Sequence, residues 1–105
     1  MKNAVLGKDY VLSVVIVGDA RSQALNNEYR GKNVPTDILS FQITSTEGEI
    51  FLNLKQAKIK AREFDRPFEN FVGFLFIHGL FHLKGLTHGS TMERKEEQVR
   101  KKFRI

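Results

Sequence analysis

The segment 71–83 (FVGFLFIHGLFHL) constrains the fold of this chain more than any other. Pro67 suits the first turn of a helix, and the pattern after it predicts a helix that runs to about Lys84. Apolar side chains would then occupy nearly every face of that helix, which must therefore be buried in a core. The apolar run is too short to cross a bilayer and is interrupted by two histidines, so no membrane association is expected.

The rest of the chain must pack around this helix, and its patterns alternate between strand and helix. Runs of β-branched residues predict strands, and the turn sequence 45–48 predicts that the last two strands form a hairpin. Asp19 is predicted to N-cap the first helix, with Ala24 and Leu25 facing the core. The predicted elements are strands at 10–17, 36–43 and 49–53 and helices at 20–29, 55–64 and from Ser90 onward, the last with Met92, Val99 and Phe103 as its apolar positions.

The strands gather in the first half of the chain and the helices in the second, an order that predicts an α+β fold. The 105 residues fit one domain, which we expect to span residues 1–105. The chain contains no Cys, which excludes disulfides and a Cys nucleophile. Because no segment has the pattern of a signal peptide, we expect a cytoplasmic protein.

Charge is distributed unevenly along the chain. Residues 1–54 carry five Lys or Arg and six Asp or Glu, whereas residues 55–105 carry twelve and six, and the two halves together make the net charge of +5. A basic half attracts polyanions, of which RNA and DNA are the commonest in a cytoplasm. The alternative is a solvated basic surface without a partner.

All three histidines lie within eleven residues, in the sequence H-G-L-F-H-L-K-G-L-T-H. His78 and His82 are four residues apart on the predicted helix, which places both imidazoles on one face. The helix is expected to end at Gly85, and a reversal there can bring His88 back as a third ligand. Three imidazoles leave one tetrahedral position open, as in catalytic zinc sites. We therefore predict one Zn²⁺ per chain; the alternative is three ordinary hydrogen-bonded histidines.

The residue after His78 limits the chemistry of such a site. In zinc peptidases with the motif His-Glu-x-x-His, the Glu is the general base. Here that position is Gly79, so a peptidase mechanism lacks its base. A metal site can still activate water, which leaves other hydrolytic reactions open.

Three blocks of the sequence resemble the YbeY family of bacterial endoribonucleases, also called rRNA maturation factors. The family motif H-G-x-x-H-L-x-G-Y-D-H corresponds to the histidine block from His78 to His88. The motif N-x-x-Y-R-x-x-x-x-P-T-D-V-L-S-F corresponds to NNEYRGKNVPTDILSF from Asn26 to Phe41, and G-D-I corresponds to Gly48-Glu49-Ile50. The blocks come in the family's order, and the resemblance spans about residues 10–103.

The resemblance implies a small mixed β-sheet packed with helices, one of them a zincin-like helix that carries the metal site. It implies that His78, His82 and His88 bind zinc and that Arg30 is functionally important. It also implies metal-dependent cleavage of single-stranded RNA, chiefly in 16S rRNA 3′-end maturation and quality control on the small ribosomal subunit. The planar guanidinium of Arg30 would match phosphate oxygens; without the resemblance, Arg30 reads as a solvated charge at a helix end.

Other candidate residues are less specific. Asp37 and Glu49 lie near strand ends and could orient water or hold the second nitrogen of a ligand, although a local turn role is expected for Asp37. Lys84 could contact phosphate, and Glu96 corresponds to the last residue of a family M-x-x-x-E motif. Leu86-Thr87 replaces the family's Tyr-Asp, and this departure favours an alternative function, a non-catalytic ribosome assembly or RNA-binding factor with a structural zinc.

Overall fold

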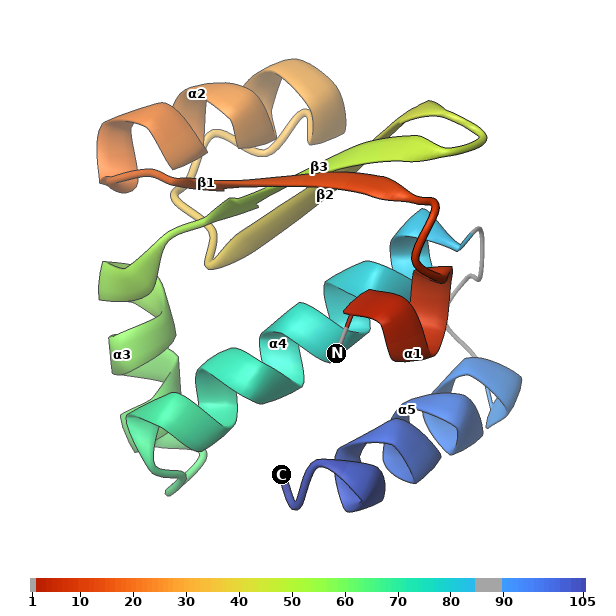
Figure 1. The fold of residues 1–105 in the computed structure, drawn as a ribbon. Helices are drawn as coiled ribbons and strands as arrows, with labels where there is room; N and C mark the ends of the chain where they lie inside the picture. The colour runs from red at the N-terminus through yellow and green to blue at the C-terminus, as the bar shows by residue number, and fades with distance from the viewer. Residues whose placement is uncertain (1, 85–89) are drawn as a thin grey trace.

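The structure is a computed structural model that describes residues 2–84 and 90–105 (Figure 1). The predicted elements are confirmed to within two residues at the bounds described. A short additional helix, α1, was not predicted, because five residues are too few to show helical periodicity. In chain order the elements are α1 (Lys2–Leu6), β1 (Val11–Ile16), α2 (Asp19–Arg30), β2 (Ile38–Thr44), β3 (Glu47–Leu52), α3 (Leu54–Glu63), α4 (Phe68–Leu83) and α5 (Ser90–Lys102).

The three strands form one sheet in the order β1-β3-β2. Strand β2 pairs antiparallel with β3, with Ser40 opposite Ile50, which confirms the predicted hairpin. Strand β1 pairs parallel with β3, because β2 starts at the end of the sheet where β1 stops and β3 then reverses direction again: Ile16 and Ile38 both pair with Leu52. The sheet is therefore mixed, and the α+β prediction is confirmed.

Helix α4 lies across one face of the sheet and forms the centre of the core (Figure 1). It contacts β2 and the helices α1, α3 and α5, so its burial on nearly all sides is confirmed. In the part of the chain that the structure describes, no helix is long and apolar enough to cross a membrane. The buried residues of α4 are Phe71, Leu75, Ile77, Gly79, Leu80, Phe81 and Leu83.

Helix α2 lies on the opposite face of the sheet, where it contacts β2 (Figure 1). Leu25 is buried as predicted, but Ala24 is exposed, so the expectation that both face the core was wrong for Ala24. The other buried side chains of α2 are polar, Ser22 and Asn26. The sequence did not predict that these two side chains are buried, because only apolar residues were expected to face the core. They are buried because they form hydrogen bonds to the loop that follows α2.

Candidate functional site

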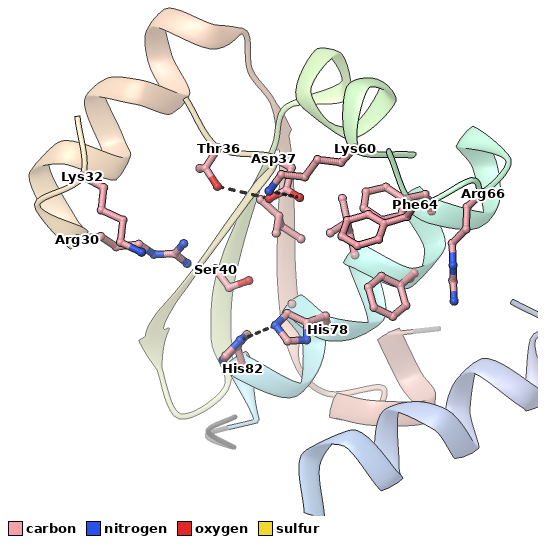
Figure 2. Close-up of a pocket in the computed structure, with 15 residues that line it drawn as sticks. Arg30, Lys32, Thr36, Asp37, Ser40, Lys60, Phe64, Arg66, His78 and His82 are labelled. Carbon is pink, nitrogen blue, oxygen red and sulfur yellow. Dashed lines mark hydrogen bonds and ion pairs between the residues drawn. The ribbon is translucent and has the colours of Figure 1, made fainter. Parts of the chain in front are cut away.

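A cleft of about 760 Å³ lies between two walls (Figure 2). One wall is the end of α2 with the loop that follows, and the other is formed by α3 and α4. Strand β2 contributes Ser40 between the walls, near the imidazoles of α4. Four cationic side chains line the cleft, which makes it attractive to an anion. They are Arg30 and Lys32 on the first wall and Lys60 and Arg66 on the second.

The two histidines of α4 point toward each other at the cleft (Figure 2). Nε2 of His82 lies 2.9 Å from Nε2 of His78, and the rings are nearly perpendicular, at 83°. The two nitrogens are within hydrogen-bonding distance of each other, and such proximity is what two ligands of one ion require. Among residues 2–84 and 90–105, no group of three His, Asp or Glu side chains is placed to hold a metal. The predicted third ligand, His88, lies outside the described residues, as do Gly85 and Leu86-Thr87.

A carboxylate from α5 completes the surroundings of His78. Oε1 of Glu96 lies 2.7 Å from Nδ1 of His78, and Glu96 is only 5% exposed. With the Nδ1–H donated to this carboxylate, Nε2 of His78 carries the lone pair and faces Nε2 of His82. Histidines that bind metals usually donate their other N–H to a carboxylate or carbonyl in this way. The two described imidazoles are thus donors of the kind that zinc takes.

No role at the histidines was predicted for Glu96, although the sequence contained a sign of it. On the terminal helix, Glu96 falls on the same stripe as Met92, Val99 and Phe103, which were predicted to be apolar positions. A carboxylate on the inward stripe of a helix needs a buried partner. Glu49, which was considered for this role, lies within β3 opposite Phe41 and is not among the residues that line the cleft.

Gly79 allows α4 to lie directly on the sheet. A Cβ atom at this position would stand 2.9 Å from Oγ of Ser40 and 3.0 Å from Cδ1 of Ile38. Because a larger side chain would meet β2, the glutamate of the zinc peptidase motif has no room here. The close approach also places His78 and His82, on either side of Gly79, beside the cleft.

We expect the substitution Gly79→Val to lower the free energy of unfolding by about 1–3 kcal/mol, the usual cost of overpacking a core. Gly79→Ala should cost less, because the Ser40 hydroxyl can rotate and Ala gains up to about 1 kcal/mol of helix propensity over Gly. Urea denaturation of the three proteins measures the difference. A Val variant as stable as the wild type would show that α4 does not pack as closely as described.

Arg30 is the last residue of α2, and its exposed side chain faces the cleft (Figure 2). Gly31 ends the helix in the left-handed region, with φ of 68°, and turns the chain back. The buried amide of Asn26 donates to the carbonyl of Val34 at 3.0 Å, which ties the helix to the loop. The sequence block from Asn26 to Phe41 therefore contains the residues whose contacts fix the position of Arg30 at the end of α2.

A second tie joins this loop to α2 at the other end of the helix. The Thr36 N–H donates to Oγ of Ser22 at 3.0 Å, and the Ser22 hydroxyl donates to the Thr36 carbonyl at 3.1 Å. Ser22 also accepts a hydrogen bond from the side chain of Asn53 at 3.2 Å. The loop from α2 to β2 is thus held to the helix at Val34 and Thr36 by two buried polar side chains.

Asn53 connects the two walls of the cleft. Its Nδ2 donates to Oδ1 of Asp19 at 2.9 Å, and its Oδ1 caps α3 by accepting from the N–H of Gln56. Hydrogen bonds from Asn53, Gln56 and Lys55 lower the pKa of Asp19 to about 2. The predicted N-cap role of Asp19 was wrong: Gly18 is the N-cap, and the Asp19 carboxylate binds α3 instead.

Asp37 has a different role from the local turn that was expected. It is 6% exposed, and its Oδ2 forms an ion pair with Nζ of Lys60 at 3.1 Å (Figure 2). The pair holds the Lys60 ammonium at the cleft. Lys84, which was considered as a phosphate contact, is the C-cap of α4 and is not among the residues that line the cleft.

The fold and the cleft together define a class: a small α+β protein in which a cationic cleft holds a pair of converging imidazoles. The family model described as Endoribonuclease YbeY matches residues 1–104. This chain belongs to the YbeY family, whose members are endoribonucleases by name, and the resemblance seen in the sequence is confirmed.

Individual relatives agree with this assignment. The Endoribonuclease YbeY of Neorickettsia sennetsu is 36% identical, over 94% of this chain and 77% of that protein. The one from Alkaliphilus oremlandii is 35% identical, over 87% of this chain and 70% of that protein. The solution structure of TM1509 from Thermotoga maritima superposes with a TM-score of 0.68 at 28% identity, covering 97% of this chain and 78% of that one.

Proposed function

We propose that this protein is a metal-dependent endoribonuclease that cleaves single-stranded RNA with one zinc ion per chain. The observation that carries the proposal is the convergence of the His78 and His82 Nε2 atoms, 2.9 Å apart, in a cleft lined by four cations. His78 and His82 would hold the ion together with His88, in a zincin-like arrangement on α4. Zinc in such a site supplies a Lewis acid that polarises a phosphoryl oxygen or activates water.

The chain's own residues account for binding and orientation. Arg30 stands on the wall opposite the histidines, where its planar guanidinium can bind a phosphate through two hydrogen bonds (Figure 2). Lys60, held by Asp37, adds charge from the other wall. Glu96 orients the His78 ring through Nδ1. None of these groups reads a base sequence, so the cleft as described binds the backbone of a strand.

We extend the proposal to the biological substrate on the basis of family membership. The RNA would be 16S rRNA, cleaved during 3′-end maturation and in quality control on the small ribosomal subunit, in the cytoplasm. The whole chain, residues 1–105, would act as one domain.

The test combines metal analysis and RNA cleavage on the same purified sample. We expect about one zinc per chain and cleavage of a single-stranded oligoribonucleotide, with no cleavage of the same sequence in a duplex. Arg30→Ala should keep the zinc and lower kcat/KM by roughly 10- to 150-fold, the value of a hydrogen-bonded charge. Arg30→Lys should recover part of the loss, since a lysine keeps the charge without the planar fork.

Arg21→Ala is the matched control, because Arg21 is an exposed arginine of α2 outside the residues that line the cleft. It should cleave RNA like the wild type. Cleavage that survives both Arg30→Ala and His82→Ala would contradict the proposal.

One contact favours a second candidate, a non-catalytic RNA-binding assembly factor in which zinc is structural. The Glu96–His78 hydrogen bond joins α5 to α4, so a metal at His78 would also stabilise the docking of α5. This candidate predicts RNA binding without turnover and a large loss of thermal stability on zinc removal. A metal-free protein that melts like the zinc-loaded one would argue against it. A peptidase is disfavoured, since Gly79 leaves no space for a glutamate base.

A further inference from the structure

Three phenylalanine rings form a ladder at the α3–α4 end of the cleft. The rings of Phe64 and Phe71 are 5.8 Å apart between centroids at an interplanar angle of 18°, and those of Phe71 and Phe74 are 5.9 Å apart at 23°. Phe71 is buried, whereas Phe64 is 64% exposed, and all three rings line the cleft. The ladder therefore runs from the core to an open aromatic face beside the candidate site (Figure 2).

The backbone holds Phe64 in this exposed position. Phe64 is the C-cap of α3, and its N–H donates to the Lys60 carbonyl at 3.0 Å. The next residue, Asp65, has φ of 52°, an uncommon value for a residue other than glycine. The N–H of Arg66 then donates back to the Ala61 carbonyl at 2.9 Å. The turn thus fixes a large apolar ring at the surface of the cleft, supported from behind by Phe71.

Cationic residues flank Phe64 along the chain, and the Arg66 guanidinium lies over Phe74 and donates to Oδ1 of Asn70 at 3.1 Å. Lys60 lies one turn before Phe64 on α3 and Arg66 lies two residues after it, and both line the cleft. The guanidinium groups of Arg66 and Arg100 lie 4.8 and 5.0 Å from the centroid of Phe74. An exposed ring with positive charges nearby complements a nucleobase, which offers a flat face, and its phosphates, which are negative.

We propose that Phe64 is the stacking platform for one unpaired nucleobase of the RNA strand, with Lys60 and Arg66 beside its phosphates. This inference rests on the proposed function, because it takes RNA to be the ligand of the cleft. A base can stack there only if it is unpaired, since a duplex covers the faces of its bases. Phe71 precedes His78 by seven residues of α4, roughly 10 Å along the helix. The base on Phe64 would therefore flank the phosphate at the histidines, and it would favour single strands.

The first test uses the absence of tryptophan from the chain. Phe64→Trp introduces one indole, whose fluorescence a stacked base would quench. The zinc-loaded variant is mixed with single-stranded decaadenylate in a stopped-flow instrument, so that binding is read before turnover. We expect strong quenching by decaadenylate and little by an abasic ribose-phosphate decamer with the same charge. In the control Phe103→Trp, at an exposed position directly after α5 and outside the residues that line the cleft, neither strand should quench.

The second test measures affinity without the reporter. Phe64→Leu keeps an apolar side chain but removes the aromatic face, and it should raise the Kd for decaadenylate by about 5- to 150-fold. Phe64→Tyr should bind like the wild type. The Kd for the abasic strand should be the same in all three proteins.

Equal quenching by the two strands, or a Leu variant that binds decaadenylate as the wild type does, would overturn the platform. RNA cleavage that depends on His82 but comes without base-dependent quenching would overturn the platform and leave the nuclease. Base-dependent quenching without cleavage would uphold the platform and contradict the nuclease. The two failures are thereby distinguishable.

Discussion

His82→Ala is expected to release the zinc ion and to lower RNA cleavage by about 10³-fold, because a metal contributes several kcal/mol to the transition state of such a reaction. Nε2 of His82 is one of the two converging nitrogens on α4, so its loss leaves the described part of the site with one imidazole. The backbone should be unaffected, since alanine favours a helix more than histidine does. Zinc content after dialysis and initial rates on single-stranded RNA measure both effects.

His82→Cys is the matched variant, because a thiolate is also a good zinc ligand. It should retain zinc after dialysis, whereas the Ala variant should not. Circular dichroism of all three proteins separates loss of the ion from loss of the fold. An Ala variant that keeps one zinc per chain would show that His82 is not a ligand.

Glu96→Gln is expected to weaken zinc binding by about 10- to 100-fold, the usual effect of removing the carboxylate behind a ligating histidine. The amide has nearly the shape of the carboxylate but carries no charge, so its hydrogen bond to Nδ1 of His78 is weaker. The effect is measured as the zinc Kd in competition with a chromophoric chelator, which requires no RNA.

Glu97→Gln provides the control for Glu96→Gln. Glu97 is the next residue of α5, but it is exposed and pairs with Lys101, at 3.4 Å, on the surface. Such a pair contributes little to stability, so neither folding nor zinc affinity should change measurably. If Glu96→Gln binds zinc as tightly as Glu97→Gln does, the carboxylate does not support the site.

The sequence predicted most of the fold because its strongest patterns were local. The apolar run of α4, the β-branched strands and the turn of the β2–β3 hairpin all act between near neighbours, and the structure confirms each. The four-residue spacing likewise predicted that His78 and His82 share a face, and their nitrogens converge. Their role as zinc ligands, with His88, stays a prediction.

What could not be predicted depends on packing between distant segments. Glu96 reaches His78 across 18 residues because α5 packs against α4, and Asp37 meets Lys60 because α3 and β2 both pack against α4. The aromatic face at Phe64 depends on Phe71 standing behind it after an irregular turn. Periodicity along one element carries no information about such partners, although a carboxylate on an apolar stripe indicates that one exists.

The buried amide of Asn53 has a consequence for how substrates could be discriminated. The Asn53 side chain donates hydrogen bonds to Asp19 and Ser22 of α2, the helix that ends at Arg30, and its Oδ1 caps α3, the helix that carries Lys60. One side chain therefore helps to fix the width of the cleft between its two walls. A substitution there is expected to alter the span from guanidinium to imidazoles while leaving every residue that lines the cleft intact. Related proteins with another residue at this position are thus expected to admit different strands, although that residue does not contact the strand itself.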